Sequence, residues 1–305
     1  MTTRVPSGWP APRRPAAVAG AFYPADPAHL RELVTAELDE AARLAAGVPL
    51  ASGVPIGLLV PHAGLVYSGV VAATAWRLLE GAGSTTVVIL GTNHRAGWLD
   101  GLAAWDRGSW VTPLGDETVD EDLASAIVAL AAPFGVDREA HLEEHSIEVQ
   151  LPLLRCAVTA STIVPLAVSF GTDTGAIEAG RRLGGLLRAR RLAGARIVLA
   201  ISSDMAHYPT AAAAKAVTEE LLPTILALDP EALAAAERGL RARVLGGRGP
   251  RGLACGMCGI EPTVVGLAAL GAMGATRGTA LATATSADAG GPPDRTVGYL
   301  AVRFD

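Results

Sequence analysis

Short runs of apolar, often β-branched residues alternate with longer amphipathic stretches along most of the chain. The short runs predict buried strands over residues 56–60, 85–90, 161–168 and 196–201, and a less regular last strand over 296–304. The amphipathic stretches predict helices at about residues 28–45, 69–80, 120–131, 146–157, 176–190, 211–227, 230–244 and 262–273. Strands that are apolar on both faces and alternate with helices indicate an α/β fold, with a mainly parallel sheet covered by helices on both faces.

The length of 305 residues suggests about two domains as a prior. No internal repeat or low-complexity linker interrupts the pattern, so we expect a single α/β domain over residues 16–305. Prolines are frequent near the N-terminus, at Pro6, Pro10, Pro12 and Pro15. They predict a flexible leader over residues 1–15.

Composition narrows the class of protein. Half of the residues are apolar, which allows a large core and excludes a disordered or disulfide-built protein. The net charge is −5 and no basic stripe is present, so we expect neither nucleic acid nor an anionic membrane as a partner. No uninterrupted apolar stretch reaches about 18 residues, so no membrane span is expected. Three cysteines cannot build a disulfide framework, which favours a cytoplasmic location.

Polar residues follow three of the predicted strands. His62 follows the strand at 56–60, His94 follows that at 85–90, and Asp204 and His207 follow that at 196–201. Sites in open α/β sheets form beyond the carboxyl ends of the strands. Two histidines and one anionic ligand would suit non-haem iron or catalytic zinc, and a histidine can also carry protons near neutral pH. The alternative for each residue is a polar side chain that merely caps a strand or turn.

The acidic segment at 141–148 holds two more histidines, His141 and His145. Their i,i+4 spacing could bind zinc on a helix, but the His-Glu-x-x-His pattern of metalloproteases is absent. The acidic run is also typical of the first turn of a helix. On such a helix His145 and Glu148 share a face, so we expect them to point together into a cleft.

Cys255 and Cys258 form a single C-x-x-C segment. A structural zinc site normally needs two such pairs. A redox pair, a thiolate that ligates iron, copper or zinc, and a small buried hydrophobic residue all stay open.

Seven short segments occur in the order AGAFYP (19–24), PHAG (61–64), YSG (67–69), GTNH (91–94), EHSIEVQLP (144–152), SSDMAHY (202–208) and ACG (254–256). Together they resemble the Memo family, also called AmmeMemoRadiSam system protein B, over most of the chain. The fold of that family is similar to that of class III extradiol ring-cleaving dioxygenases, which carry non-haem Fe(II).

The resemblance implies a metal site made of His62, His94 and Cys255, where Cys255 takes the place of a glutamate in the dioxygenases. It implies Fe(II) as the metal, although copper or zinc could take the same donors. His207 matches the acid/base histidine of the dioxygenases, and Asp204, His145 and Glu148 would line the same cleft. Cys258 departs from the expected pattern, because it offers a second thiol as a ligand or as a disulfide partner for Cys255.

The resemblance implies a non-haem iron-dependent oxidoreductase that uses O2 on a small aromatic substrate. In this hypothesis His207, oriented by Asp204, moves the proton, while His145 and Glu148 set ligand orientation and substrate position. One alternative is a peptide-binding adaptor with a vestigial metal site, and another is a zinc-dependent hydrolase. A radical-SAM system protein is a further expected partner, since the family name associates the two.

Overall fold

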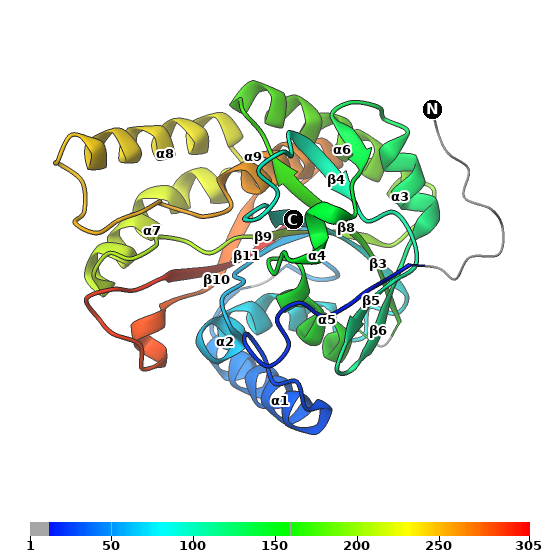
Figure 1. Ribbon diagram of the computed structural model, residues 1–305, viewed down its shortest axis with the longest axis horizontal. Helices are drawn as coiled ribbons and strands as arrows, with labels where there is room; N and C mark the ends of the chain where they lie inside the picture. The colour runs from blue at the N-terminus through cyan, green and yellow to red at the C-terminus, as the bar shows by residue number, and fades with distance from the viewer. Residues whose placement is uncertain (1–11, 50, 159) are drawn as a thin grey trace.

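The computed structural model describes residues 12–49, 51–158 and 160–305. Its centre is an eleven-stranded sheet in the order β1-β5-β6-β8-β3-β9-β2-β11-β10, and beside this path β4 pairs with β8 and β7 pairs with β4 (Figure 1). The strands are β1 (Arg13–Arg14), β2 (Gly57–Val60), β3 (Thr85–Thr92), β4 (Gly101–Ala104), β5 (Ser109–Thr112), β6 (Gly115–Val119), β7 (Phe134–Val136), β8 (Ser161–Ser169), β9 (Ile197–Ser202), β10 (Gly278–Thr285) and β11 (Gly298–Phe304).

The middle of the sheet is parallel, as the apolar runs predict. β8, β3, β9 and β2 pair in parallel, and nearly all of their residues are buried. Antiparallel pairs lie beside this block: β11 joins β2 and β10 on one side, and β5 joins β6 on the other. The α/β class with a mainly parallel sheet is therefore confirmed. All five predicted strands form within two residues of their expected bounds.

Helices cover both faces of the sheet (Figure 1). In the view of Figure 1, α1, α2 and α5 lie below the sheet, and α3, α6, α8 and α9 lie above it. The helices are α1 (Pro27–Leu44), α2 (Leu65–Trp76), α3 (Glu121–Val128), α4 (Glu139–Leu142), α5 (Leu151–Ala157), α6 (Asp173–Leu192), α7 (Ala211–Leu226), α8 (Pro230–Leu245) and α9 (Ile260–Met273), with 3-10 turns η1 (Arg77–Leu79), η2 (Glu148–Gln150) and η3 (Ser286–Ala289). Asp26 and Asp229 cap α1 and α8 as expected, since each carboxylate accepts backbone N–H groups of the first turn.

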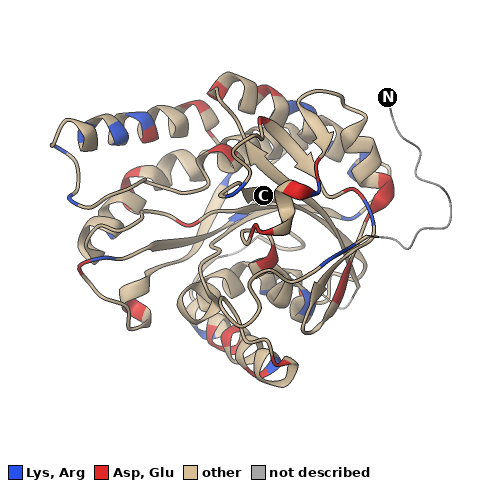
Figure 2. Ribbon diagram, viewed as in Figure 1, with Lys and Arg blue, Asp and Glu red and all other residues tan. Residues whose placement is uncertain are grey.

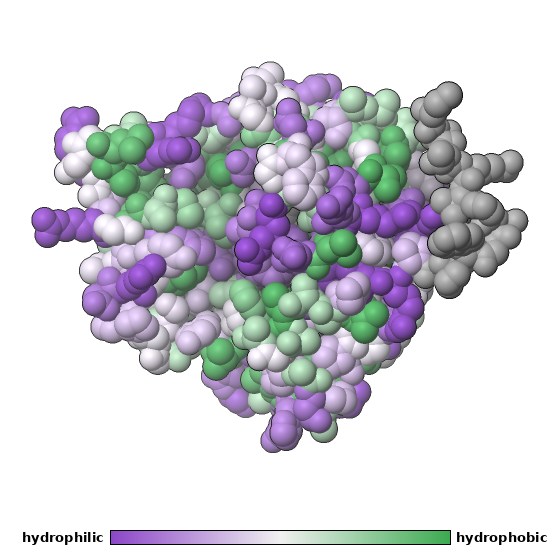
Figure 3. All heavy atoms as spheres, in the orientation of Figure 1, coloured by the Kyte–Doolittle hydropathy of each residue, from purple (hydrophilic) through white to green (hydrophobic). Residues whose placement is uncertain are grey.

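The surface carries charges of both signs. Lys and Arg are interspersed with Asp and Glu, and both kinds occur on α1 and on α8 (Figure 2). On the face shown in Figure 3, apolar residues form small groups separated by polar ones. Within the described residues, no helix has the length and apolar character needed to cross a membrane.

The expected leader needs a correction at its end. Residues 1–11 lie outside the described part of the chain, but Arg13 and Arg14 form β1 and pair in parallel with β5. The Arg14 side chain is fully buried, because its guanidinium finds acceptors in the segment 141–148. The folded domain therefore begins before residue 16.

Candidate metal centre

The carboxyl ends of three neighbouring strands carry the predicted site residues. β9 lies between β3 and β2, and all three run in the same direction. His62 and Asp204 each follow their strand by two residues, as does His94. The parallel arrangement thus brings together side chains that lie as many as 142 positions apart in the sequence.

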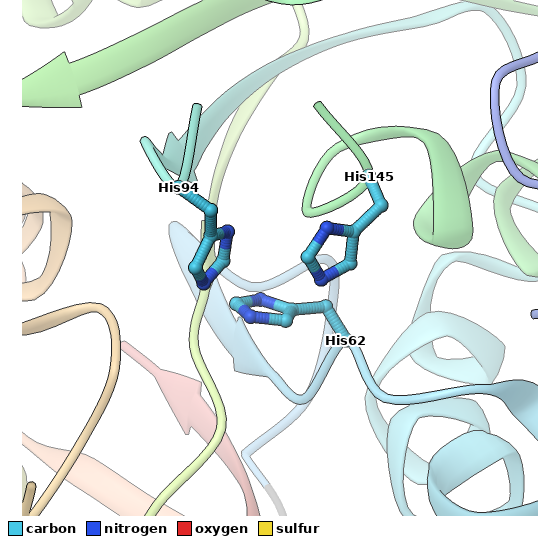
Figure 4. A group of neighbouring side chains, drawn as sticks. All are labelled: His62, His94 and His145. Atoms are coloured by element: carbon cyan, nitrogen blue, oxygen red, sulfur yellow. The ribbon is translucent and has the colours of Figure 1, made fainter. Parts of the chain in front are cut away.

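Three imidazoles converge at this edge of the sheet: His62, His94 and His145 (Figure 4). The ring of His62 lies 5.4 Å from each of the other two, and the rings of His94 and His145 are stacked at 4.7 Å between centroids. One nitrogen of each ring lies within 4.8 Å of the other two, a spacing that allows a single metal ion to bind all three. His145 comes from the loop between α4 and η2.

Glu144 orients two of these histidines. Its carboxylate accepts the backbone N–H groups of His94, His145 and Ser146 at 2.6–2.9 Å. One oxygen also lies 3.0 Å from Nδ1 of His94 and 3.3 Å from Nδ1 of His145. Burial opposes the charge of Glu144, but the hydrogen bonds with His94 outweigh it and keep the pKa of the carboxyl low. An ionised Glu144 accepts a hydrogen bond from the Nδ1–H of His94 and leaves the Nε2 lone pair free, which is a common arrangement around metal-binding histidines.

A serine sets the tautomer of His62. Ser202 Oγ donates to the carbonyl of Ser146 at 2.6 Å and receives the Gln150 amide at 3.1 Å. Its only hydrogen is therefore used, so the contact of 2.9 Å with Nδ1 of His62 must be a hydrogen bond that the imidazole donates. Nε2 of His62 then carries a lone pair towards the cavity.

Burial keeps the imidazoles of His62 and His145 neutral. Burial lowers the pKa of His62 well below its usual value and lowers the pKa of His145 to about 4. Neutral imidazole is the form that binds a metal. The donor set at this edge therefore fits a divalent ion at neutral pH.

A thiol three residues beyond the predicted ligand Cys255 lies against His62. Cys258, and not Cys255, contacts the histidines: its Sγ lies 3.2 Å from Nε2 of His62 and forms a second potential ligand group with His62 and Asp204. Cys255 lines the same cavity, but it belongs to neither ligand group and also borders a smaller cavity of about 280 Å³. Its backbone pairs with that of His207.

Asp204 has a different task from the predicted one. Its carboxylate accepts the backbone N–H groups of His62 and Ala63 at 2.7 and 3.2 Å, so it fixes the start of the loop that carries His62. Burial raises the pKa of Asp204 to about 7. His207 lines the cavity as expected, and within the described residues its buried Nε2 has no hydrogen-bond partner. The prediction that Asp204 orients His207 is not supported by these contacts.

Comparison with known proteins identifies the family. The sequence model described as "Memo-like protein" matches residues 14–303. The chain belongs to the Memo family. A "MEMO1 family protein" of Methanopyrus kandleri is 35% identical over 302 residues, covering 95% of this chain and 98% of the relative. One of Aquifex aeolicus is 33% identical, with 95% and 98% covered.

Among solved structures, an uncharacterized protein of Escherichia coli K12 matches at 15% identity and a TM-score of 0.49, covering 82% of this chain and 99% of that one.

Glu148 does not point into the cavity of this Memo-family chain. It is fully buried and binds Arg14, Tyr23 and the backbone of residues 17–18. The expectation fails because His145 lies in a loop and Glu148 begins the 3-10 turn η2, so the two do not share a helical face.

Two residues that orient the histidines, Glu144 and Ser202, were not among the predicted site residues. Glu144 stands next to His145, Ser202 stands two residues before Asp204, and both occur in segments that resemble the Memo family. The signal that was available is a carboxylate or hydroxyl adjacent to a candidate ligand, since metal-binding histidines usually donate their second N–H to such a group.

Proposed function

We propose that this Memo-family chain is a non-haem Fe(II)-dependent oxidoreductase that uses O2 on a small aromatic substrate. His62 and His94 would hold the ion, with His145 or Cys258 as the third ligand. The observation that carries the proposal is the orientation of the imidazoles. Ser202 contacts Nδ1 of His62 and Glu144 contacts Nδ1 of His94, while one nitrogen of each of the three rings lies within 4.8 Å of the other two. Two histidines and one further ligand with open positions suit mononuclear iron.

When bound, Fe(II) supplies open coordination positions and the redox chemistry by which O2 reacts with an aromatic ring. The chain supplies an acid/base group in His207. Burial lowers the pKa of His207 to about 4, so the imidazole is neutral and its unpartnered Nε2 can accept a proton from a substrate hydroxyl. This assignment puts His207 in contact with substrate, whereas Asp204 acts on the backbone of the His62 loop.

The cavity favours an uncharged ring. Its volume is about 660 Å³, and its walls include Phe22, Tyr67 and Tyr208. No Arg or Lys is among the side chains that line it, all of which belong to the described residues. Aromatic side chains bind a flat apolar ligand by offset stacking or edge contacts, and a carboxylate would find no cationic side chain among those that line the cavity.

The three-histidine group also fits a second candidate. Three neutral imidazoles are the ligand set of some catalytic zinc sites, in which zinc lowers the pKa of a bound water. A zinc-dependent hydrolase would use the same His62, His94 and His145. The two candidates differ in the metal that the protein retains and in their requirement for O2.

Anaerobic purification followed by elemental analysis tests the proposal. We expect about one iron per chain in the wild type and loss of the metal in His62→Ala and His94→Ala. Cys255→Ser is the matched control for Cys258→Ser, because both thiols line the cavity but only Cys258 contacts His62. Cys255→Ser should retain the metal, and comparison of Cys258→Ser with His145→Ala identifies the third ligand.

An O2 electrode then measures oxygen consumption with catechol and with a carboxylated catechol as probes. Faster consumption with the uncharged catechol supports the proposal. Iron content that is unchanged in both His62→Ala and His94→Ala would overturn the site. Retained zinc with ester cleavage that is independent of air would favour the hydrolase instead.

A further inference from the structure

The segment that precedes α1 crosses the molecule beside the metal centre. Arg14, in β1, is fully buried, and its guanidinium lies 4.0 Å from the ring centroid of Trp110. It donates to the carbonyl of His141 at 2.8 Å, to the carbonyl of Glu144, and to the carboxylate of Glu148 at 2.5 Å. The Arg14 side chain thus forms hydrogen bonds with both ends of the loop that carries His145.

Glu148 binds the same segment at three more points. Its carboxylate accepts the N–H groups of Ala17 and Val18 at 2.8 and 2.9 Å and the hydroxyl of Tyr23 at 2.5 Å. Both Glu148 and Arg14 are completely buried, so solvent does not screen the pair. The Glu148 carboxylate and the Arg14 guanidinium therefore fasten residues 13–23, which we call the strap, to the loop 141–148.

The strap reaches the metal centre through Phe22. Its ring lies 4.7 Å from the imidazole of His145 and lines the cavity. The carbonyl of Phe22 accepts the N–H of Leu65 at 2.8 Å, directly after the His62 loop. A displacement of the strap would therefore move both the wall of the cavity and the neighbour against which His145 packs.

We propose that Glu148 is a positioning residue for the metal centre: together with Arg14 it locks the strap to the loop 141–148 and so fixes His145 and Phe22. This inference rests on the proposed function only in that a metal binds beside His145. Glu148 itself does not line the cavity and belongs to neither potential ligand group. Its effect is carried by the backbone of the loop and by the Phe22 ring.

Glu148→Gln tests this assignment, because glutamine keeps the size of the side chain and removes the charge that Arg14 binds. The chain offers a matched control in Glu117 of β6, which is also buried, 1% exposed in its side chain, and paired with Arg155 at 3.0 Å. Glu117 does not line the cavity and does not contact the strap. Glu117→Gln therefore measures the general effect of neutralising a buried, paired glutamate.

The experiment is a Co²⁺ titration of the metal-free full chain, followed by visible absorption and by competition with a chelator. We expect Glu148→Gln to weaken Co²⁺ binding by about 10- to 100-fold, the range found for residues that orient metal ligands, and to change the d–d bands. Glu117→Gln should lower the midpoint of thermal unfolding but leave both the affinity and the bands as in the wild type. Tyr23→Phe, which removes one hydrogen bond to Glu148, should produce a smaller change in the same direction.

Hydrogen exchange of the metal-free proteins gives a second readout. Glu148→Gln should speed exchange at residues 17–23 and 143–147 together, and Glu117→Gln should not. Wild-type affinity and spectrum in Glu148→Gln would overturn the inference, and so would wild-type behaviour of Tyr23→Phe if Glu148→Gln does not fold. A wild type that binds no Co²⁺ would instead overturn the proposed function, while the exchange result would still decide whether Glu148 locks the strap.

Discussion

A buried carboxyl in α1 should make the stability of the protein depend on pH. Glu37 is only 4% exposed, packs beside Gly69 of α2, and its Oε2 has no hydrogen-bond partner among the described residues. Burial raises the pKa of Glu37 from 4.5 to about 8. The folded protein therefore keeps this proton in a range where the unfolded chain has released it.

The direction of the effect follows from proton binding. Between the unfolded and folded pKa values the native state holds one proton more than the unfolded state, so the free energy of unfolding falls as the pH rises. The slope for one proton is about 1.4 kcal/mol per pH unit, which gives a loss on the order of 4 kcal/mol between about pH 5 and pH 8. Below the unfolded pKa the stabilisation is fully present.

Glu37→Gln should remove this dependence, since glutamine stays neutral at every pH. Guanidinium unfolding at several pH values measures the free energy of unfolding for the variant and the wild type. We expect the free energy of unfolding of Glu37→Gln, relative to that of the wild type, to rise by several kcal/mol from about pH 5 to pH 8. Glu40→Gln, on the same helix but exposed and paired with Arg43, is the control and should show no such shift. A difference between Glu37→Gln and the wild type that stays constant with pH would refute the reasoning.

Two further substitutions test how the metal centre is held. A Cβ on Gly91 would lie 2.4 Å from the side chain of Ile147. Gly91→Ala should therefore lower the free energy of unfolding by about 1–3 kcal/mol in chemical denaturation, and should weaken Co²⁺ binding because the loop of His145 is displaced. An unchanged free energy of unfolding would contradict this packing. Ser202→Ala removes the acceptor of the Nδ1 proton of His62, so Co²⁺ affinity should fall at least about tenfold in chelator competition, whereas Ser161→Ala at the far end of β8 should leave it unchanged.

Much of the fold could be predicted because its signals are local. All eight predicted helices form, since apolar periodicity and caps such as Asp229 act within a few residues. Strand β10, whose small residues alternate weakly, and the short strands β4 to β7 at the side of the sheet were not predicted. Strand β1 was not predicted either, because the ordering of Arg14 depends on acceptors more than 120 positions away.

The residues of the candidate site also divide into those that local sequence signals predict and those that depend on distant contacts. His62, His94 and Asp204 were predictable, because the residue that follows a parallel strand lies at a known edge of the sheet. The choice between Cys255 and Cys258 was not, since a loop has no periodicity that fixes which side chain faces a histidine. The position of His145 likewise depends on the contacts of Glu144, which pairs with His94 50 positions earlier in the chain.

The place of β11 has a consequence for biosynthesis. This strand is made after the other ten, yet it inserts between β2 and β10. Val297 just before it pairs with His207, and Tyr299 within it lines the cavity. A nascent chain still lacking these residues on the ribosome holds every histidine of the centre but not the finished pocket. Completion of the cavity therefore waits until residues 297–299 have been made and β11 has inserted between its two neighbours.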